Sequence, residues 1–379
     1  MIAVFWISLA GIVTAYAGYP ILLKALSAVH RRPIAKGPAL ARVSVLIAAH
    51  NEEASIEATV RNKLELDYPA ELREIIVISD GSEDRTDEIV RRFEERGVRL
   101  LVQSPRQGKT AALNWAAREA QGEILVFSDA NSMYRADALK AIVGNFSDPS
   151  VGYVTGKMIY VDDTGSVIGD GCSAYMKYEN VLRDLETRIG SVVGVDGGVD
   201  AVRKSLFEPM RPELLPDFVL PLNVVDKGFR VVYEPSAILM EHSLTDATDE
   251  LRMRVRVILR SFHAMWHKRR LLNPFRAGLF AFQMFFHKVL RYLVGVLQIT
   301  AFASNAALVG WAPGYTVIFI AQVTFYVLAV IGYRRREAAD LSGLFRYPYY
   351  LCLLNGASLI ALWKFMKGEN IAVWKPRKG

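Results

Sequence analysis

Cysteine is scarce in this sequence, which has only Cys172 and Cys352 among its 379 residues. Two distant cysteines supply neither a disulfide framework nor a cysteine-rich zinc site. The chain has no evident internal repeat or low-complexity tract. Its composition, 52% hydrophobic and 22% charged, excludes a collagen and a disordered tail. The length has room for two ordinary domains, because domains average roughly 100–200 residues.

Two common phosphate-binding signatures are also missing from the sequence. No G-x-G-x-x-G follows the first predicted strand, which argues against a dinucleotide site, and no G-x-x-x-x-G-K-[ST] is present. The net charge of +7 is compatible with nucleic acid, a membrane surface or anionic substrates. The cations of the stretch 252–270 adjoin apolar runs, where anionic lipid headgroups account for them, and no nucleic-acid-binding module is recognisable. We therefore expect membrane lipids as partners and no nucleic acid.

Long uncharged runs lie at both ends of the chain. Residues 2–23 carry no charge and exceed the roughly 20 residues that cross a bilayer as a helix. This run lacks a basic segment before it, so it favours an uncleaved anchor over the alternative of a cleaved signal peptide. Residues 292–333 are also uncharged, and a turn at 311–314 divides them into two spans. The shorter run 347–363 is either a third span or a re-entrant segment.

The basic residues beside these runs predict the orientation in the membrane. Cations follow the first span at positions such as Lys24, Arg31 and Arg42, and they place the central part of the chain in the cytoplasm. Arg334–Arg336 fits the same side after a two-span hairpin. The C-terminal cations also favour the cytoplasm, whereas three simple spans would put them outside. A re-entrant segment would resolve that conflict, and the expected localisation is a multi-pass inner-membrane protein.

The central part of the chain alternates short apolar runs with helical segments. The predicted strands are 43–49, 75–79, 100–102 and 124–128, and the predicted helices between them are 53–64, 84–96 and 109–120. Strands and helices that alternate at this spacing indicate βαβ units in the α/β class, with a twisted and mainly parallel sheet.

Polar residues follow three of these strands and are expected to meet in one crevice, because ligands bind beyond the carboxyl ends of parallel strands. They are His50-Asn51-Glu52, the segment 80–84, and Asp129-Ala130-Asn131. The Asp129 carboxylate and Asn131 amide are oxygen ligands suited to Mg²⁺ or Mn²⁺ together with substrate phosphates. Lys109 would add a second cation near those phosphates. The alternatives are a strand-end cap for Asp129 and a solvated first-turn residue for Lys109.

Four ordered motifs resemble those of membrane-bound family 2 glycosyltransferases with a GT-A fold, of the kind that build bacterial cell-surface polysaccharides. The motifs are 48–53 (AAHNEE), 77–84 (VISDGSED), 108–114 (GKTAALN) and 127–131 (FSDAN). The match covers roughly residues 42–267. It implies a nucleotide-sugar donor and inversion at the anomeric carbon.

The resemblance also assigns residues to the donor. Ala49, Glu52 and Asp80 would hold the nucleoside, with Asp80 near the base, and Lys109 would lie by the uridine or diphosphate. Asp129 and Asn131 match the D-x-D motif that holds a divalent metal, here Mg²⁺ or Mn²⁺. Asn131 replaces the second aspartate, which removes one charge from the metal site and leaves the metal dependence open.

An inverting transferase needs a carboxylate base to deprotonate the acceptor hydroxyl. Asp217, in Pro216-Asp217-Phe218, stands where the resembled family has this residue. Its alternative role is a helix N-cap, which aspartate favours. Residues 194–203 resemble the acceptor-side strand and turn of the family, so Asp196 and Gly197 are expected to contact the acceptor, glycine allowing close backbone approach.

Processive members of the family carry Gln-x-x-Arg-Trp after the base helix. The closest register here is 257–261, where only Arg260 survives and could contact the diphosphate. Trp266 lies six residues later, so single-sugar transfer is favoured. The stretch 252–270 mixes apolar residues with seven cations, which predicts a helix on the membrane surface. An amphipathic helix packed on the domain is the alternative.

The sequence therefore predicts a hexosyl- or N-acetylhexosaminyltransferase that moves a sugar from a UDP-sugar to a lipid-linked or growing glycan at the cytoplasmic face. The alternatives are a processive synthase that also secretes its polymer and an inactive scaffold of a polysaccharide export complex. Partners in such an assembly complex are possible. The expected segments are an anchor (1–27), a GT-A domain (40–250), interfacial helices (251–290), a membrane region (291–366) and a basic tail (367–379).

Overall fold

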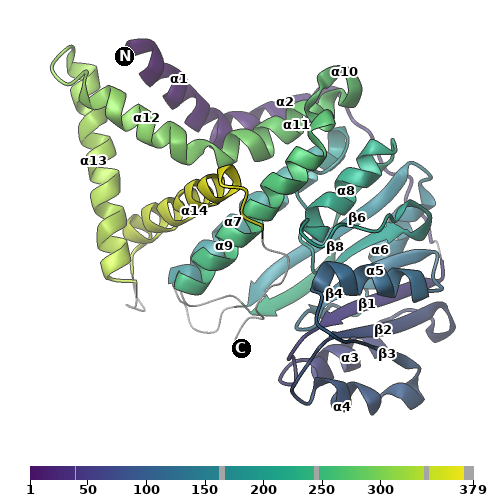
Figure 1. Cartoon of the computed structure of the whole chain (residues 1–379). Coiled ribbons are helices and arrows are strands. Elements are labelled where there is room, and N and C mark those ends of the chain that lie inside the picture. The colour runs from purple at the N-terminus through teal and green to yellow at the C-terminus, as the bar shows by residue number, and fades with distance from the viewer. Residues whose placement is uncertain (39, 162–166, 243–246, 337–340, 371–379) are drawn as a thin grey trace.

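The computed structural model describes residues 1–38, 40–161, 167–242, 247–336 and 341–370. An α/β domain forms one side of the molecule, and long helices from both ends of the chain form the other (Figure 1). The basic tail predicted at 367–379 lies outside the described residues from position 371 onward.

A sheet of eight strands in the order β3-β2-β1-β4-β7-β6-β8-β5 runs through the α/β domain. Its first half is parallel and consists of β1 (Val43–Ala49), β2 (Arg73–Asp80), β3 (Val98–Gln103) and β4 (Ile124–Asp129). Every residue of β1 is buried, as is typical of a parallel strand covered on both faces. The four predicted strands are confirmed, each within a few residues of its expected ends.

The second half of the sheet mixes directions. It contains β5 (Met133–Tyr134), β6 (Val151–Val161), β7 (Asp200–Arg203) and β8 (Arg230–His242). β7 runs antiparallel between β4 and β6, β6 pairs with β8 in parallel, and the short β5 closes the edge antiparallel to β8. The sheet as a whole is mixed and mainly parallel, in agreement with the predicted fold class.

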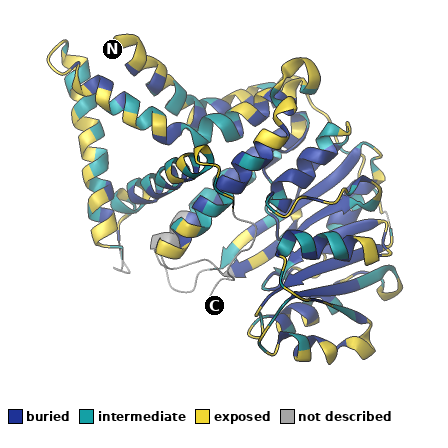
Figure 2. Ribbon diagram, in the orientation of Figure 1, coloured by how far each residue is buried: buried dark blue, intermediate teal, exposed yellow. Residues whose placement is uncertain are grey.

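Helices cover both faces of the sheet, and alternate residues of each strand point to opposite faces. One core places Leu46 and Ile76 against α5 (Lys109–Glu119) and α8 (Pro216–Asp226). The opposite core places Ile47 against helices on the other face. Those helices are α3 (Ile56–Leu64), α4 (Thr86–Arg91) and α6 (Ala138–Gly144). The sheet between the two layers is almost wholly buried (Figure 2).

Among the described residues, three helical stretches are long and apolar enough to cross a membrane. The first, Ile2–Val29, joins α1 (Ile2–Val13), the π-helical turn η1 (Thr14–Gly18) and α2 (Tyr19–Val29). The others are α13 (Pro313–Arg334) and α14 (Gly343–Met366). α13 carries apolar residues on nearly all sides, and only Ala329 and Gly332 of this helix are buried (Figure 2), as expected for a lipid-facing helix.

The uncharged run 292–333 forms a different arrangement from two simple spans. Its first helix, α12 (Val294–Ala306), has 13 residues, or about 20 Å, and is too short to cross a bilayer alone. It continues α11 (Leu279–Met284) and the π-helix η7 (Phe285–Leu290) across a bend of 61°, and the two parts together could make a fourth span. The predicted turn is present, because α13 begins at Pro313.

The remaining long helices join the domain to the membrane region. α7 (Val167–Ile189) packs on the sheet and against α2, and α9 (Ala247–His267) packs between α8 and α14 (Figure 1). α9 buries Leu259 on the domain side and stacks Phe262 on Phe365 of α14, with ring centroids 5.5 Å apart. Six apolar residues of α9 are buried against protein, as in the alternative of a helix packed on the domain, whereas Trp266 is 62% exposed. The location of this helix at the membrane surface stays a prediction. Short helix α10 (Pro274–Ala277) follows.

Candidate active site

The strand register brings the predicted crevice residues to one edge of the sheet. Ala48 pairs with Asp129 and Ala49 with Ser79, so β1, β2 and β4 end at the same level. A cavity of about 630 Å³ opens beyond this edge. Its lining includes these predicted site residues: Glu52, Lys109, Asp129, Asn131, Asp196 and Asp217.

Lys109 lies between Asp129, at the end of β4, and Asp217, near the start of α8. It is the first residue of α5, and its Nζ atom lies 2.6 Å from Asp129 Oδ1 and 3.8 Å from Asp217 Oδ2. Burial acts to lower the pKa of Lys109, but the carboxylates of Asp129 and Asp217 outweigh it and hold that pKa above its ordinary value. Lys109 is therefore a permanent cation at the strand ends.

Asp217 is the second residue of α8, after the N-cap Leu215 and Pro216. The alternative role of N-cap is thus wrong. In the described part of the chain its carboxylate accepts no hydrogen bond, and its side chain is 27% exposed in the cavity. Burial raises the pKa of Asp217, and nearby Lys109 opposes that rise. A carboxylate with available oxygens and a raised pKa is suited to accept a proton.

Gly197 lies directly against Asp217. Its φ is +89°, and a Cβ atom there would stand 2.5 Å from Asp217 Cγ, so only glycine permits this approach. The loop is held by Asp200, whose Oδ2 accepts from Gly197 N at 2.9 Å and from Tyr153 Oη at 2.8 Å. Burial raises the pKa of Asp200 to about 7. Asp200 was not predicted as a site residue, although it follows the glycine pair within the segment 194–203.

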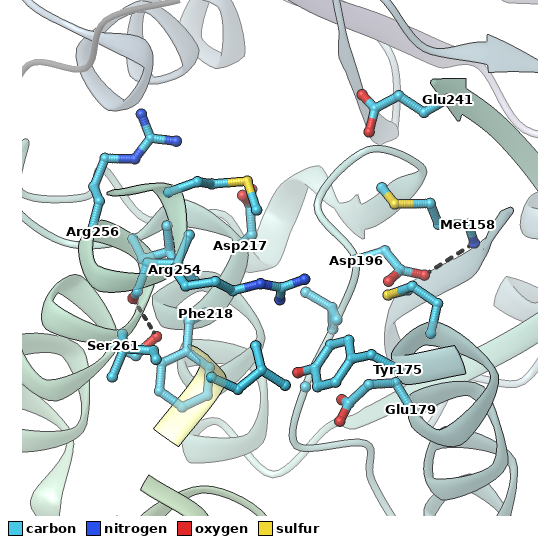
Figure 3. A pocket seen from close by; sticks show the side chains of 18 of the residues that line it. Met158, Tyr175, Glu179, Asp196, Asp217, Phe218, Glu241, Arg254, Arg256 and Ser261 are labelled. Carbon is cyan, nitrogen blue, oxygen red and sulfur yellow. Dashed lines mark hydrogen bonds between the residues drawn. The ribbon is translucent and has the colours of Figure 1, made fainter. Parts of the chain in front are cut away.

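Asp196 lines the cavity, yet its two oxygens already have partners. Oδ1 lies 2.7 Å from Arg183 of α7, and Oδ2 accepts from Met158 N at 3.2 Å (Figure 3). Arg183 Nε also donates to Gly194 O at 2.8 Å. Direct contact between Asp196 and the acceptor stays a prediction, and the geometry favours a positioning role in the loop. The contribution of α7 was not predicted either, although its polar residues Glu179, Arg183 and Glu186 recur at helical spacing.

Asp80 is 2% exposed and does not line the cavity. Its carboxylate accepts from Gln107 N and Gly108 N, both at 2.8 Å, and from the Gln103 amide at 2.7 Å. Asp80 therefore anchors the segment that leads to Lys109, and its direct contact with the base stays a prediction. Ala49 is likewise buried outside the lining, where its neighbour Ala48 stands instead.

Arg260 is 5% exposed and donates several hydrogen bonds to the protein. Its guanidinium donates to the carbonyls of Pro212 at 3.1 Å and Glu213 at 3.3 Å, and to Thr110 Oγ1 at 3.1 Å. These bonds tie α9 to the segment before Asp217 and to α5. Arg260 also lines the cavity, so its predicted contact with the diphosphate stays a prediction beside the positioning role that these bonds support.

The donor set at the end of β4 fits a divalent ion that takes only part of its coordination from protein. The Asp129 carboxylate is 36% exposed, and Asn131 lines the same cavity. Glu241, at the end of β8, also lines it (Figure 3). The described residues contain no group of three or more His, Cys, Asp or Glu side chains placed to hold a metal. Mg²⁺ or Mn²⁺ bound through one or two protein oxygens plus phosphate and water fits this set.

The fold is that of GT-A glycosyltransferases. The structure superposes with a TM-score of 0.70 on the mannosyltransferase PcManGT from Pyrobaculum calidifontis, solved in complex with GDP-Man and Mn²⁺. The match covers 95% of this chain and 99% of that one, at 23% identity, so the helical region shares the fold as well.

A family model, Glycosyl transferase family 2, matches residues 44–199. Among curated proteins, the Probable glycosyltransferase YdaM of Bacillus subtilis (strain 168) is 29% identical over 217 residues, covering 53% of this chain and 51% of that protein. The Poly-beta-1,6-N-acetyl-D-glucosamine synthase of Staphylococcus aureus (strain COL) is 28% identical over 216 residues, covering 55% and 52%. The chain spans about half the length of these relatives. Residues 44–199 therefore form a family 2 glycosyltransferase domain, and the chain is similar to glycosyltransferases that include a polysaccharide synthase.

Proposed function

We propose that this enzyme transfers a hexose or N-acetylhexosamine from a UDP-sugar, with inversion, to a lipid-linked or growing glycan in surface polysaccharide biosynthesis. The observation that carries the proposal is the convergence of Asp217, Lys109 and Asp129 in one cavity. An available carboxylate there lies 3.8 Å from a cation that is itself bonded to the proposed metal and phosphate site.

In the proposed reaction Asp217 accepts the proton of the acceptor hydroxyl as its oxygen attacks the anomeric carbon. The bond from that carbon to the donor phosphate breaks, and UDP leaves with the electron pair. Lys109 offsets negative charge that grows on the diphosphate. Asp129 and Asn131 would hold the divalent ion, which when bound supplies further charge neutralisation. The loop at Gly197 fixes where the Asp217 carboxylate lies.

The membrane arrangement is part of the proposal. The segments 1–27 and 291–366 would mount the catalytic domain 40–250 on the inner membrane, with that domain in the cytoplasm. Support comes from the spans at Ile2–Val29, α13 and α14 and from the cations that follow the first of them. In this proposal the segment 251–290 connects the catalytic domain to the membrane region at the membrane surface, and its helix α9 packs against protein as well.

The name of the staphylococcal relative favours a processive synthase as the second candidate. The incomplete Gln-x-x-Arg-Trp motif and the structural use of Arg260 favour single addition. The product formed by purified enzyme from one labelled donor separates them, since one predicts single additions and the other long chains. An inactive scaffold would release no UDP from any donor, with or without Mn²⁺.

The test is a panel of UDP-sugars and GDP-mannose, with donor-dependent release of nucleotide as the readout. We expect turnover with a UDP-sugar. We also expect Asp217→Asn to abolish transfer and leave UDP binding intact, because the proposal assigns the acceptor proton, and not the nucleotide, to Asp217. Asp67→Asn, an exposed carboxylate that pairs with Lys140, is the control. Loss of UDP binding in Asp217→Asn would contradict the assignment of Asp217 as base.

A further inference from the structure

The cavity that holds the proposed base continues toward the membrane helices. Past Asp217 its lining includes Tyr16 of η1, Lys288 of η7, and Leu351 and Leu354 of α14. Tyr16 and the α14 residues belong to the candidate spans Ile2–Val29 and Gly343–Met366. One continuous space therefore joins the reacting centre to apolar segments of the membrane region.

Hydrogen bonds join the three elements that form the wall of the cavity at this end. Tyr16 Oη donates to Asn355 Oδ1 of α14 at 3.0 Å, and Tyr178 Oη of α7 donates to the Tyr16 carbonyl at 3.0 Å. The N-terminal helix, α7 and α14 thus form a fixed enclosure with an aromatic and aliphatic lining. Such a lining suits a hydrocarbon chain better than a hydrated glycan.

Most cations at this end of the cavity are neutralised by buried carboxylates. The pairs are Arg183 with Asp196, Arg254 with Glu250, and Arg291 with Glu179. Each of these carboxylates is at most 2% exposed. Figure 3 shows Arg254 reaching from α9 toward Tyr175 of α7, and its guanidinium carbon lies 4.7 Å from the centre of that ring. The charges of these three arginines are therefore compensated by carboxylates of the protein itself.

Lys288 differs from them, because no carboxylate oxygen of a described residue lies within 4.0 Å of its ammonium group. The group lies over the Gly194 backbone, where a Cβ atom would stand 2.7 Å from Nζ, and 5.8 Å from the Phe218 ring centre. Gly194 belongs to the acceptor-side loop, and Phe218 follows the proposed base. The buried carboxylate that feels the charge of Lys288 is Glu179, which already pairs with Arg291 and His287. A half-buried cation without an ion pair of its own gains from a bound anion, and an ammonium suits phosphate.

We propose that the membrane end of this cavity binds a lipid acceptor whose headgroup carries a phosphate followed by a sugar. Its hydrocarbon chain lies along Tyr16, Leu351 and Leu354, its phosphate lies on Lys288, and a sugar hydroxyl reaches Asp217. That hydroxyl loses its proton to Asp217 and forms the new bond to the donor's anomeric carbon, and UDP leaves as described above. This inference rests on the proposed function and narrows its acceptor to a membrane lipid.

The test measures binding to the purified full-length protein in detergent, by thermal stabilisation. The probes are dodecyl phosphate, dodecanol, inorganic phosphate and UDP. We expect dodecyl phosphate to bind at least about tenfold more tightly than either dodecanol or inorganic phosphate. Lys288→Met should weaken dodecyl phosphate by about 10- to 100-fold, the range for a charge-assisted hydrogen bond, and leave UDP within about twofold. Lys288→Arg should retain the preference.

The control is Lys177→Gln, which removes an exposed lysine of α7 that does not line the cavity. If Lys288→Met does not fold, Leu354→Ala supplies the second test: it should weaken dodecyl phosphate and leave inorganic phosphate unchanged. Equal binding of dodecyl phosphate and inorganic phosphate would overturn the proposal, as would a preference that survives Lys288→Met. A parallel loss of UDP binding would place Lys288 in the donor site instead. Absence of nucleotide release with every donor would refute the proposed function separately, because lipid binding is measured without turnover.

Discussion

Substituting Gly197 by alanine tests whether the position of Asp217 controls the reaction. The new Cβ atom would lie 2.5 Å from Asp217 Cγ, whereas carbon atoms in contact stay roughly 3.5–4.0 Å apart. The carboxylate or the loop must therefore move by about 1 Å. A misplacement of that size at a reacting group costs about 100-fold in rate. We expect kcat to fall by about that factor while KM for the UDP-sugar stays within about twofold.

The fold should tolerate this change at a modest cost. A non-glycine residue at φ +89° loses roughly 1–2 kcal/mol of stability from the backbone conformation alone. Gly228→Ala is the matched control, because Gly228 has φ +85° and a Cβ atom added there would have no neighbouring atom within 4 Å. Steady-state kinetics and thermal unfolding of both variants separate the two effects. Wild-type kcat in Gly197→Ala, or an equal loss of kcat in Gly228→Ala, would refute the reasoning.

Two further predictions concern Asp217 and its supports. Burial raises the pKa of Asp217, and the base acts only when deprotonated, so kcat/KM should fall as pH drops through a value above the roughly 3.9 of an exposed aspartate; an acid limb at or below pH 4 would contradict this. Arg260→Lys removes the planar guanidinium that holds the segment before Asp217, so kcat should fall several-fold with little change in KM for the donor. A tenfold rise in that KM with unchanged kcat would instead support the predicted direct contact between Arg260 and the diphosphate.

The parallel half of the fold could be predicted from sequence because its signals are local. β1 and β2 are β-branched apolar runs, and polar residues follow each of them where the strands end. The strand order places those ends at one edge, which made Asp129 and Lys109 predictable neighbours. The direction of a side chain at such an edge depends on the next loop. Asp80 was therefore located correctly at the edge, but its turn toward the Gln107–Gly108 backbone was not predictable.

The amphipathic pattern of α9 shows a different limit. A helix with apolar residues on one face and cations elsewhere has the same sequence whether that face meets lipid or protein. The partner in this protein is α14, which lies about a hundred residues later in the chain and was itself ambiguous between a span and a re-entrant segment. The hydrophobic periodicity of α9 thus predicted which face of the helix is buried, but it did not distinguish between lipid and protein as the partner of that face.

The membrane region and the acceptor-side loop are connected through α7. The α/β domain is therefore joined to the membrane helices by buried hydrogen bonds. Tyr19 Oη of the first span donates to Glu186 Oε1 at 2.6 Å, and Glu186 Oε2 accepts from Val193 N at 3.0 Å. His287 of η7 contacts the same carboxylate at 2.7 Å. Two segments of the membrane mount therefore meet one buried side chain that holds the start of the acceptor-side loop. Because that loop also carries Gly197 and limits where Asp217 can lie, the position of the proposed base is coupled to the membrane helices as well as to the sheet.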